Sequence, residues 1–262
     1  MNETFDISML RLGVFLLLFA LPLICFRVLK LNLSAKLLFA VVRMLAQLTL
    51  VALYLETLFR WNHPLINGLW ILVMLFVANL SIINQAGLVF RAFAPICFAS
   101  LFLTASVIYA AFLILLEPHV LLNARYTIPL VGMTVGNLMR GNIVALNRFH
   151  SGLIQRENEY IQWIALGATR FEAARPFFGQ AVRAAVAPQI GTIATLGLVS
   201  LPGMMTGQIL GGSPPAVAIK YQIMIMTAIF TAVSLSTFLS IRFSILTSFD
   251  AFDRIKPGLM KG

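Results

Sequence analysis

The stretch RENEYIQWIALGATRFEAARPFFGQAVR, from Arg156 to Arg183, is a charged segment that lies between long apolar regions of the chain. It carries charges of both signs and many residues that favour helices. Gly167 in its middle permits a sharp turn, and Thr169 can cap a following helix. We therefore expect a helical insert over residues 149–185, in which two helices meet at a turn.

This insert has two interpretations. A charged helical segment between membrane helices is typical of a surface that binds a partner in the cytoplasm, and a short second helix would then present Arg170, Phe171 and Glu172. The alternative is an amphipathic helix that lies on the bilayer surface. The acidic residues and the break at Gly167 favour the first interpretation.

The composition around the insert indicates a membrane protein. Of the 262 residues, 60% are apolar and only 11% are charged, whereas soluble domains carry about 25% charged residues. The net charge of +10 would suggest nucleic acid in a soluble protein, but here the basic residues lie in short loops and indicate orientation instead. We expect lipid as a partner and no nucleic acid. Cys25 and Cys97 lie in apolar surroundings and imply no disulfide framework.

Seven segments are long enough to cross a hydrocarbon core of about 30 Å at about 1.5 Å per residue. Because no cleavage site follows the first apolar run, we expect that run to remain as a helix. The sequence thus predicts an all-α membrane protein with a single transmembrane domain, residues 1–262. The seven predicted spans are residues 8–29, 37–60, 65–90, 93–117, 126–148, 186–210 and 218–242.

The distribution of basic residues predicts the orientation. Fifteen of the 19 Lys and Arg residues fall on one side of the predicted spans, and Arg11, Arg60, Arg125 and Lys220 fall on the other. Since cytoplasmic loops carry the excess of Lys and Arg, we expect the N-terminus outside and the C-terminus inside. The insert 149–185 is then cytoplasmic.

Polar residues recur along one stripe of several spans. In the second span Gln47 and Tyr54 share a helical face, and in the fifth span Met133 and Asn137 do so. The third span carries Asn84. Polar groups are costly against lipid, so they face either other helices or a wet pathway. As a set, they favour a pathway.

The sixth span is interrupted by Pro and Gly. Pro202 removes a backbone donor, which predicts a break near residues 201–203. Broken helices expose carbonyls that can meet a substrate, and methionine thioethers suit soft metals, although Met also fills gaps in apolar cores. The complete set of candidate pathway residues is Gln47, Tyr54, Asn84, Met133, Asn137, Pro202, Gly203, Met204, Met205, Gln208 and Gln222.

Several motifs are missing from the chain. It contains no GxxxxGK[ST], HExxH or GxSxG pattern. If ATP powers the protein, ATP and Mg²⁺ would bind to a separate subunit. The alternative is a gradient-driven transporter or channel, which would usually carry an acidic residue or His inside the membrane; Glu56 and Glu117 instead fall near span ends. Gly132 and Gly136 form a GxxxG pattern that permits close helix packing.

Five segments together resemble a known family. They are GMTVGN (132–137), IALGATRFEAA (164–174), LGLVSLPGMMTGQILGG (196–212), AIKYQIM (218–224) and SLST (234–237). They resemble the FetB-type iron-export permeases, a family that includes plant aluminium-tolerance permeases.

The resemblance implies a seven-span permease of the bacterial inner membrane that pairs with a separate ABC-type ATP-binding subunit, as a dimer of each. It implies export of iron or a related metal by alternating access, with no cofactor bound by this chain and no enzymatic activity of its own. By motif position, Pro202–Met205 belong to the family's most recognisable membrane segment. The residues implied to dock the ATPase are Leu166, Gly167, Ala168, Thr169, Arg170, Phe171, Glu172 and Ala173.

Overall fold

The computed structural model describes residues 7–199, 201–256 and 258–260, and its regular elements are helices. Within these residues, extended pairing is limited to isolated bridges such as that between Leu88 and Met260. The all-α class predicted from the sequence is confirmed for the described part of the chain.

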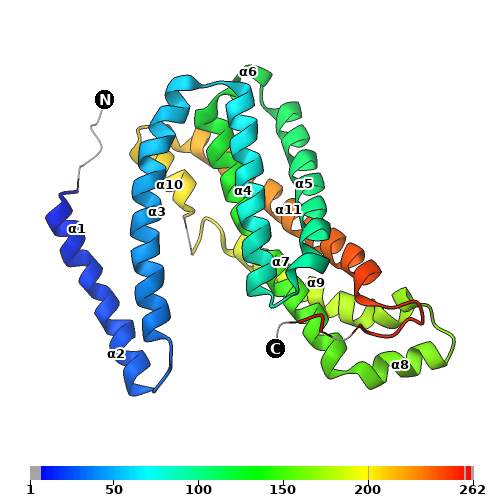
Figure 1. The fold of residues 1–262 in the computed structure, drawn as a ribbon. Helices are drawn as coiled ribbons and strands as arrows, with labels where there is room; N and C mark the ends of the chain where they lie inside the picture. Colours follow the sequence, from blue (N-terminus) through cyan, green and yellow to red (C-terminus); the bar gives the residue numbers. More distant parts are fainter. Residues whose placement is uncertain (1–6, 200, 257, 261–262) are drawn as a thin grey trace.

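The first helices form an N-terminal hairpin that stands beside the rest of the molecule (Figure 1). Helix α1 (Met9–Leu16), the 3-10 turn η1 (Leu17–Phe19) and helix α2 (Ala20–Val28) follow one another without a gap, and α3 (Ser34–Trp61) turns back. No residue of α1, η1 or α2 is buried. The hairpin joins the body near the end of α3, where Leu58 lies in an apolar cluster with Ala124 and Ile128.

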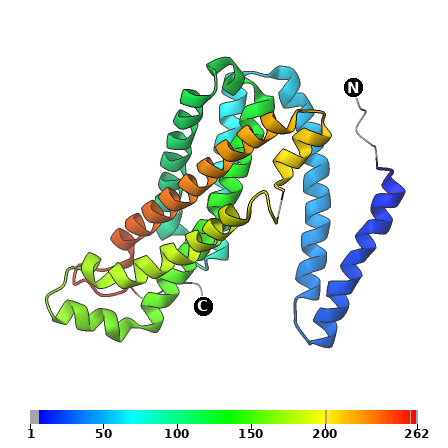
Figure 2. The ribbon, with the colours of Figure 1, turned by 180° about the vertical axis from the view of Figure 1, so that it is seen from behind.

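Five long helices form the body, which Figures 1 and 2 show from opposite sides. They are α4 (Pro64–Gln85), α5 (Phe90–Leu115), α7 (Ala124–Gln155), α9 (Arg170–Thr195) and α11 (Pro215–Ser248). The short helices are α6 (Pro118–Leu122), α8 (Glu157–Ala165) and α10 (Gly203–Leu210). Because α11 packs against α5, α7, α9 and α10, it is the central element of the body.

Five helical segments of the described chain are long and apolar enough to cross a membrane: Met9–Val28, Ser34–Trp61, Pro64–Gln85, Phe90–Leu115 and Pro215–Ser248. They coincide with the first four predicted spans and the last one. Helix α7 covers the predicted fifth span but lies outside this apolar set, because Asn and Arg residues dilute it. The predicted sixth span is not one helix, since it is divided between α9 and α10. The count of seven stays a prediction.

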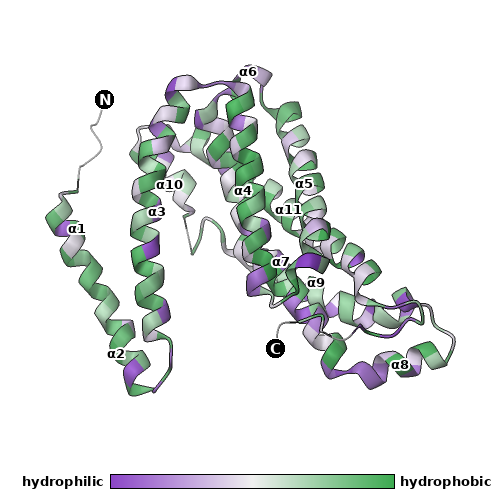
Figure 3. Ribbon diagram, viewed as in Figure 1, coloured by the Kyte–Doolittle hydropathy of each residue, from purple (hydrophilic) through white to green (hydrophobic). Residues whose placement is uncertain are grey.

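One end of the body extends beyond a membrane's thickness. Helices α7 and α11 have 32 and 34 residues, or about 50 Å at about 1.5 Å per residue, against a core of about 30 Å. The C-terminal ends of α7 and α11 lie together, and α8, the start of α9 and the segment after α11 surround them (Figure 1). Figure 3 shows hydrophilic residues on α8 and its surroundings, whereas α1 to α5 are largely hydrophobic.

A stripe of serines joins α11 to its neighbours. Ser236, Ser240, Ser244 and Ser248 recur every fourth residue and are all buried, so they lie on one face of the helix. The amide of Asn142 in α7 donates to Ser236 Oγ at 2.6 Å. Such bonds between membrane helices contribute about 0.6 kcal/mol on average. Because serine side chains are small, α7 and α11 can pack closely, and Ser236 can still accept a hydrogen bond across the contact.

Helix α7 packs tightly against α11 at Gly141. A Cβ added there would lie 2.7 Å from Val233 Cγ1 of α11, a distance that real Cβ atoms do not adopt. At Gly136 an added Cβ would meet nothing within 4 Å, and at Gly132 it would meet the end of the Met74 side chain. The tight helix contact is therefore one turn beyond the GxxxG pattern that the sequence singled out.

Candidate functional site

A polar cavity of about 370 Å³ lies where α7, α9, α10 and α11 meet. It gathers six of the candidate pathway residues: Met133, Asn137, Pro202, Gly203, Met204 and Gln222. The structure adds lining residues that the prediction did not include: Arg140, Gln189, Thr192, Ile225, Met226 and Ile229. Thioethers, carboxamides and a hydroxyl therefore converge from four separate elements.

The α7 side of this cavity is ordered by a chain of hydrogen bonds. Asn137 Nδ2 donates to the Met133 carbonyl at 2.8 Å, and Arg140 Nη2 donates to Asn137 Oδ1 at 2.9 Å. Arg140 is the charged residue among the described lining residues. Because it is exposed, water and salt weaken its repulsion of a cation.

An unused acceptor faces the cavity from α11. Gln222 is 6% exposed, and its Oε1 atom has no hydrogen-bond partner among the described residues. A buried carboxamide oxygen without a partner costs about 1–3 kcal/mol. A substrate that accepts this lone pair, such as a metal ion or a hydrogen-bond donor, would remove that cost.

The described residues between α9 and α10, 196–199 and 201–202, are not helical. Helix α9 ends at Thr195, and Pro202 caps α10 with an extended conformation, φ −66° and ψ 145°. Figure 2 shows this connection beside α11. The predicted break in the sixth span is confirmed, although the helix already ends before Leu196, earlier than expected. Helix α10 begins directly after Pro202 and places Met204 in the cavity lining.

Five candidate pathway residues lie outside the cavity lining. Gln47 is exposed on α3, and the Tyr54 ring lies 4.2 Å from that of Trp70. Asn84 is exposed near the end of α4, while Met205 and Gln208 lie on α10 without reaching the cavity. The structure thus divides the predicted set into one group around a cavity and scattered residues elsewhere.

The turn between α8 and α9 follows the geometry that its residues predict. Gly167 has φ +90°, which L side chains rarely adopt. The Thr169 side chain accepts from the Glu172 backbone N–H, and Glu172 Oε2 accepts from the Thr169 N–H at 2.8 Å. These bonds form a capping box, and the Thr169 bonds lower the pKa of Glu172. The turn is therefore sharp and well defined.

The surface presented by this turn differs from the prediction. Arg170 Nε lies 2.8 Å from Asp253 Oδ1, and the Arg242 guanidinium lies 3.7 Å from the centre of the Phe171 ring. Both side chains face the body, and Ala173 is buried. Helix α9 is also a long helix of 26 residues, because its apolar face packs on α7 and α11. The expected short helix is wrong, since α9 has 26 residues; Arg170 and Phe171 are half-buried, and Glu172 is exposed.

Three apolar residues are exposed among the hydrophilic residues at this end of the molecule. Leu166 is 82% exposed, and Ile161 and Trp163 on α8 are about half exposed. We call these three residues the α8 patch. The sequence pointed to Leu166 but missed the other two, which share no motif with it and are identified only once the exposed face of α8 is known.

The segment after α11 connects this turn to the body. The Tyr160 hydroxyl donates to the Asp253 carbonyl at 2.9 Å, and its ring stacks on Phe249 with centroids 4.9 Å apart. Burial, followed by the charge of Asp253, raises the pKa of Tyr160 to about 12, so the hydroxyl stays protonated. Further along, the Val89 N–H donates to the Leu259 carbonyl. Residues 249–260 thus link α8 to the α4–α5 connection.

Comparison with known proteins identifies the family. Residues 9–249 match the model of the uncharacterised protein family UPF0014. The chain belongs to UPF0014. No solved structure matches the chain.

Named members of UPF0014 include permeases. The chain is 33% identical to the UPF0014 membrane protein YjkA of Bacillus subtilis, over 83% of this chain and 85% of YjkA. It is 30% identical to the probable iron export permease protein FetB of Escherichia coli, over 80% of each. It is 29% identical to the protein ALUMINUM SENSITIVE 3 of Arabidopsis thaliana, over 80% of this chain and 76% of the relative. The resemblance inferred from the five segments is confirmed, and the family match extends over residues 9–249.

This UPF0014 chain is therefore a multi-pass protein of the inner membrane, in a family of membrane permeases. Within the described residues, no group of three His, Cys, Asp or Glu side chains could hold a metal ion. Met226 is the lining residue that sequence reasoning could have found, because it lies four residues, about one helical turn, after Gln222.

Proposed function

We propose that this chain is the permease subunit of an ATP-driven exporter of iron or a related metal. The observation that carries the proposal is the course of α9, which starts at the docking turn and supplies Gln189 and Thr192 to the polar cavity. Its 26 residues span about 39 Å at about 1.5 Å per residue. One continuous helix therefore links a surface suited to a partner with a site suited to a substrate.

The proposed topology has seven crossings, with the N-terminus outside and the α8 end in the cytoplasm. Helix α7 and the α9–α10 pair supply the two crossings beyond the five apolar segments. The short connections after α3 and α10 lie at the end opposite α8 (Figure 1), as alternating crossings require. The positive-inside count of basic residues supports the same orientation.

The proposed partner is a separate ABC-type subunit that binds ATP and Mg²⁺ and docks on the α8 patch and the turn after it. Two copies of each subunit would form the transporter. Closure of the ATPase pair would push the start of α9, and α9 would tilt against α11 to move the cavity from inside-open to outside-open. The relative named as the probable iron export permease FetB supports this proposal, as does the lack of a GxxxxGK[ST] motif in this chain.

The substrate proposal rests on the chemistry of the cavity. Met133, Met204 and Met226 offer soft thioether ligands, and Gln222 offers a free carboxamide oxygen. Thioethers favour metals such as Cu(I), whereas carboxamides suit harder ions. A mixed lining fits transient passage of a metal better than tight storage. The name of the FetB relative favours iron.

Docking is tested by pulling the tagged chain from native membranes in mild detergent. We expect an ABC-type ATPase to be recovered with the wild type and lost with Leu166→Arg, which places a charge in the exposed α8 patch. Gln155→Arg, at an exposed residue that ends α7 outside the α8 patch, is the matched control. Failure to recover an ATPase with the wild type would contradict the proposal.

Two neighbouring methionines test the pathway. Met204 lines the cavity and Met205 does not, so we expect Met204→Leu to weaken metal stimulation of ATP hydrolysis in the complex. The expected loss in apparent metal affinity is at least about tenfold, since even a group behind a ligand is worth this much. Met205→Leu serves as the matched control and should behave like the wild type. Equal effects of the two substitutions would mean that both thioethers only fill space.

A further inference from the structure

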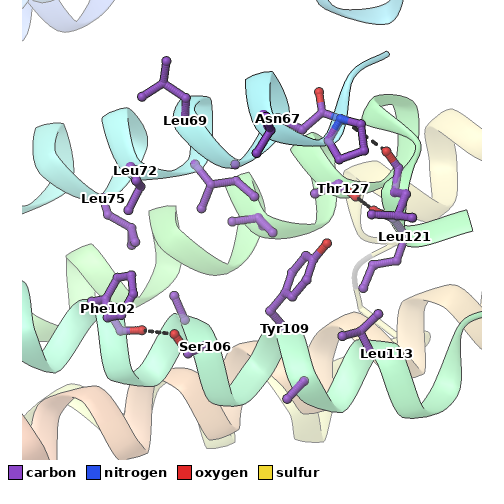
Figure 4. Close-up of a pocket in the computed structure, with 18 residues that line it drawn as sticks. Asn67, Leu69, Leu72, Leu75, Phe102, Ser106, Tyr109, Leu113, Leu121 and Thr127 are labelled. Carbon is purple, nitrogen blue, oxygen red and sulfur yellow. Dashed lines mark hydrogen bonds between the residues drawn. The ribbon is translucent and has the colours of Figure 1, made fainter. Parts of the chain in front are cut away.

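A second cavity, of about 660 Å³, lies between α4 and α5, with α6 and α7 behind it (Figure 4). Its volume falls within the range of about 300–1,000 Å³ that small-molecule sites occupy. The 18 described residues that line it carry no charge, and 14 of them are apolar, Pro or Gly. The four polar ones are Asn67, Ser106, Tyr109 and Thr127. We call this cavity the α4–α5 groove.

The α4–α5 groove opens toward lipid. Both flanking helices belong to the apolar segments long enough to cross a membrane, and Leu69 and Phe102 on its rim are 64% and 49% exposed. An added Cβ at Gly68 would meet nothing within 4 Å, which shows open space along α4. A ligand that enters from the side would therefore come from the bilayer.

The length of the groove matches one leaflet. Along α4 its lining runs from Pro64 to Leu75, or about 17 Å at about 1.5 Å per residue, which is close to half of a core of about 30 Å. It starts at the end of α4 that lies next to α6 and stops near the middle of the helix. An extended hydrocarbon chain of one leaflet would fill it.

Polar atoms lie near the α6 end of the groove. Asn67 is 4% exposed; its Nδ2 donates to the Leu122 carbonyl at 3.1 Å, and its Oδ1 has no partner among the described residues. Figure 4 shows the Tyr109 hydroxyl pointing from α5 toward the side of Thr127. A lipid ester carbonyl can accept from Tyr109, and a headgroup donor can satisfy Asn67. The groove is therefore apolar toward the middle of α4 and more polar at its α6 end, in the same order as the acyl chain and the ester and headgroup region of a phospholipid.

We propose that the α4–α5 groove is a phospholipid site that holds one acyl chain of the leaflet at the α6 end, with its ester region at Tyr109 and a headgroup donor at Asn67. The lipid then fills space between the two helices and ties them to α6. This site is separate from the polar cavity, which α9, α10 and α11 build with α7.

The test is native mass spectrometry of the purified chain after extensive detergent washing, with lipid extraction to count phospholipid. We expect one retained phospholipid per wild-type chain and roughly tenfold weaker retention in Gly68→Phe, which fills the groove. Gly13→Phe is the matched control, because an added Cβ at this exposed helical glycine also meets nothing. Melting temperatures of both variants verify that each is folded.

A second variant separates the acyl chain from its polar contact. Tyr109→Phe keeps the volume of the groove but removes the hydroxyl, so the lipid should exchange faster with added deuterated lipid than in the wild type. Equal lipid retention in Gly68→Phe and Gly13→Phe would overturn the proposal. Efficient crosslinking of two chains through Leu69→Cys would also overturn it, because a second copy would then occupy the groove.

Discussion

Replacing Gly141 by leucine is expected to leave little folded protein. The first added carbon alone would lie 2.7 Å from Val233 Cγ1, and α7 and α11 would have to separate along their whole contact. Overpacking of this kind typically costs about 1–3 kcal/mol, and more where backbone must move. We expect aggregation or a strong fall in the melting temperature, measured by fluorescence-detected gel filtration and thermal unfolding.

Two glycine-to-alanine variants, each of which adds one carbon, test whether the contact with Val233 causes the loss of stability. Gly141→Ala should lower the melting temperature, whereas Gly136→Ala, whose added carbon meets nothing, should leave it equal or higher because alanine favours helices. Val233→Ala removes the opposing carbon, so it should rescue Gly141→Ala in a double-mutant cycle. If Gly141→Ala and Gly136→Ala behaved alike, the close contact between α7 and α11 would be refuted.

Replacing Gly167 by proline is expected to abolish metal-stimulated ATP hydrolysis in the complex while leaving the membrane body folded. Gly167 has φ +90°, whereas proline fixes φ near −65°. Proline also removes the N–H that bonds to the Ile164 carbonyl at 2.9 Å. The α8–α9 turn must then open, and the start of α9 loses its fixed direction. Stimulation should fall to the basal rate of the complex.

The control for Gly167→Pro is Gly167→Asn, because asparagine tolerates positive φ better than other residues with a side chain. It should keep most of the stimulation. The melting temperature of Gly167→Pro should fall much less than that of Gly141→Leu, because the strain lies in the α8–α9 turn and not in the contact between α7 and α11. Full stimulation in the proline variant would show that the turn does not transmit movement.

Local chemistry explains which features the sequence could predict. Gly167, Thr169 and Glu172 lie within six residues, so the turn and its cap follow from residue types at fixed offsets. The break before α10 likewise follows from Pro202, because the missing donor is a property of that residue. Neither feature depends on which helices are neighbours.

Features that depend on distant partners could not be predicted in this way. Arg170 pairs with Asp253, and nothing near either residue signals the other. Gln47 and Tyr54 are seven residues apart and Met133 and Asn137 are four apart, so both pairs lie on one helical face, yet α3 stands apart from the cavity. Periodicity places residues on one face of a helix, but only the packed structure shows what that face meets.

The uneven hydropathy of the long helices has a consequence for biosynthesis. Helix α7 is more polar than the five apolar segments, and α9 and α10 are separated by a non-helical connection. While the ribosome makes these parts, their amides, glycines and open backbone have no partner, because the serine stripe that packs on α7 lies in α11, the last helix made. We therefore expect α7 and the α9–α10 pair to enter the bilayer late, as a unit with α11. A nascent chain stopped before residue 215 would hold its apolar segments in the membrane and leave α7 accessible to soluble reagents.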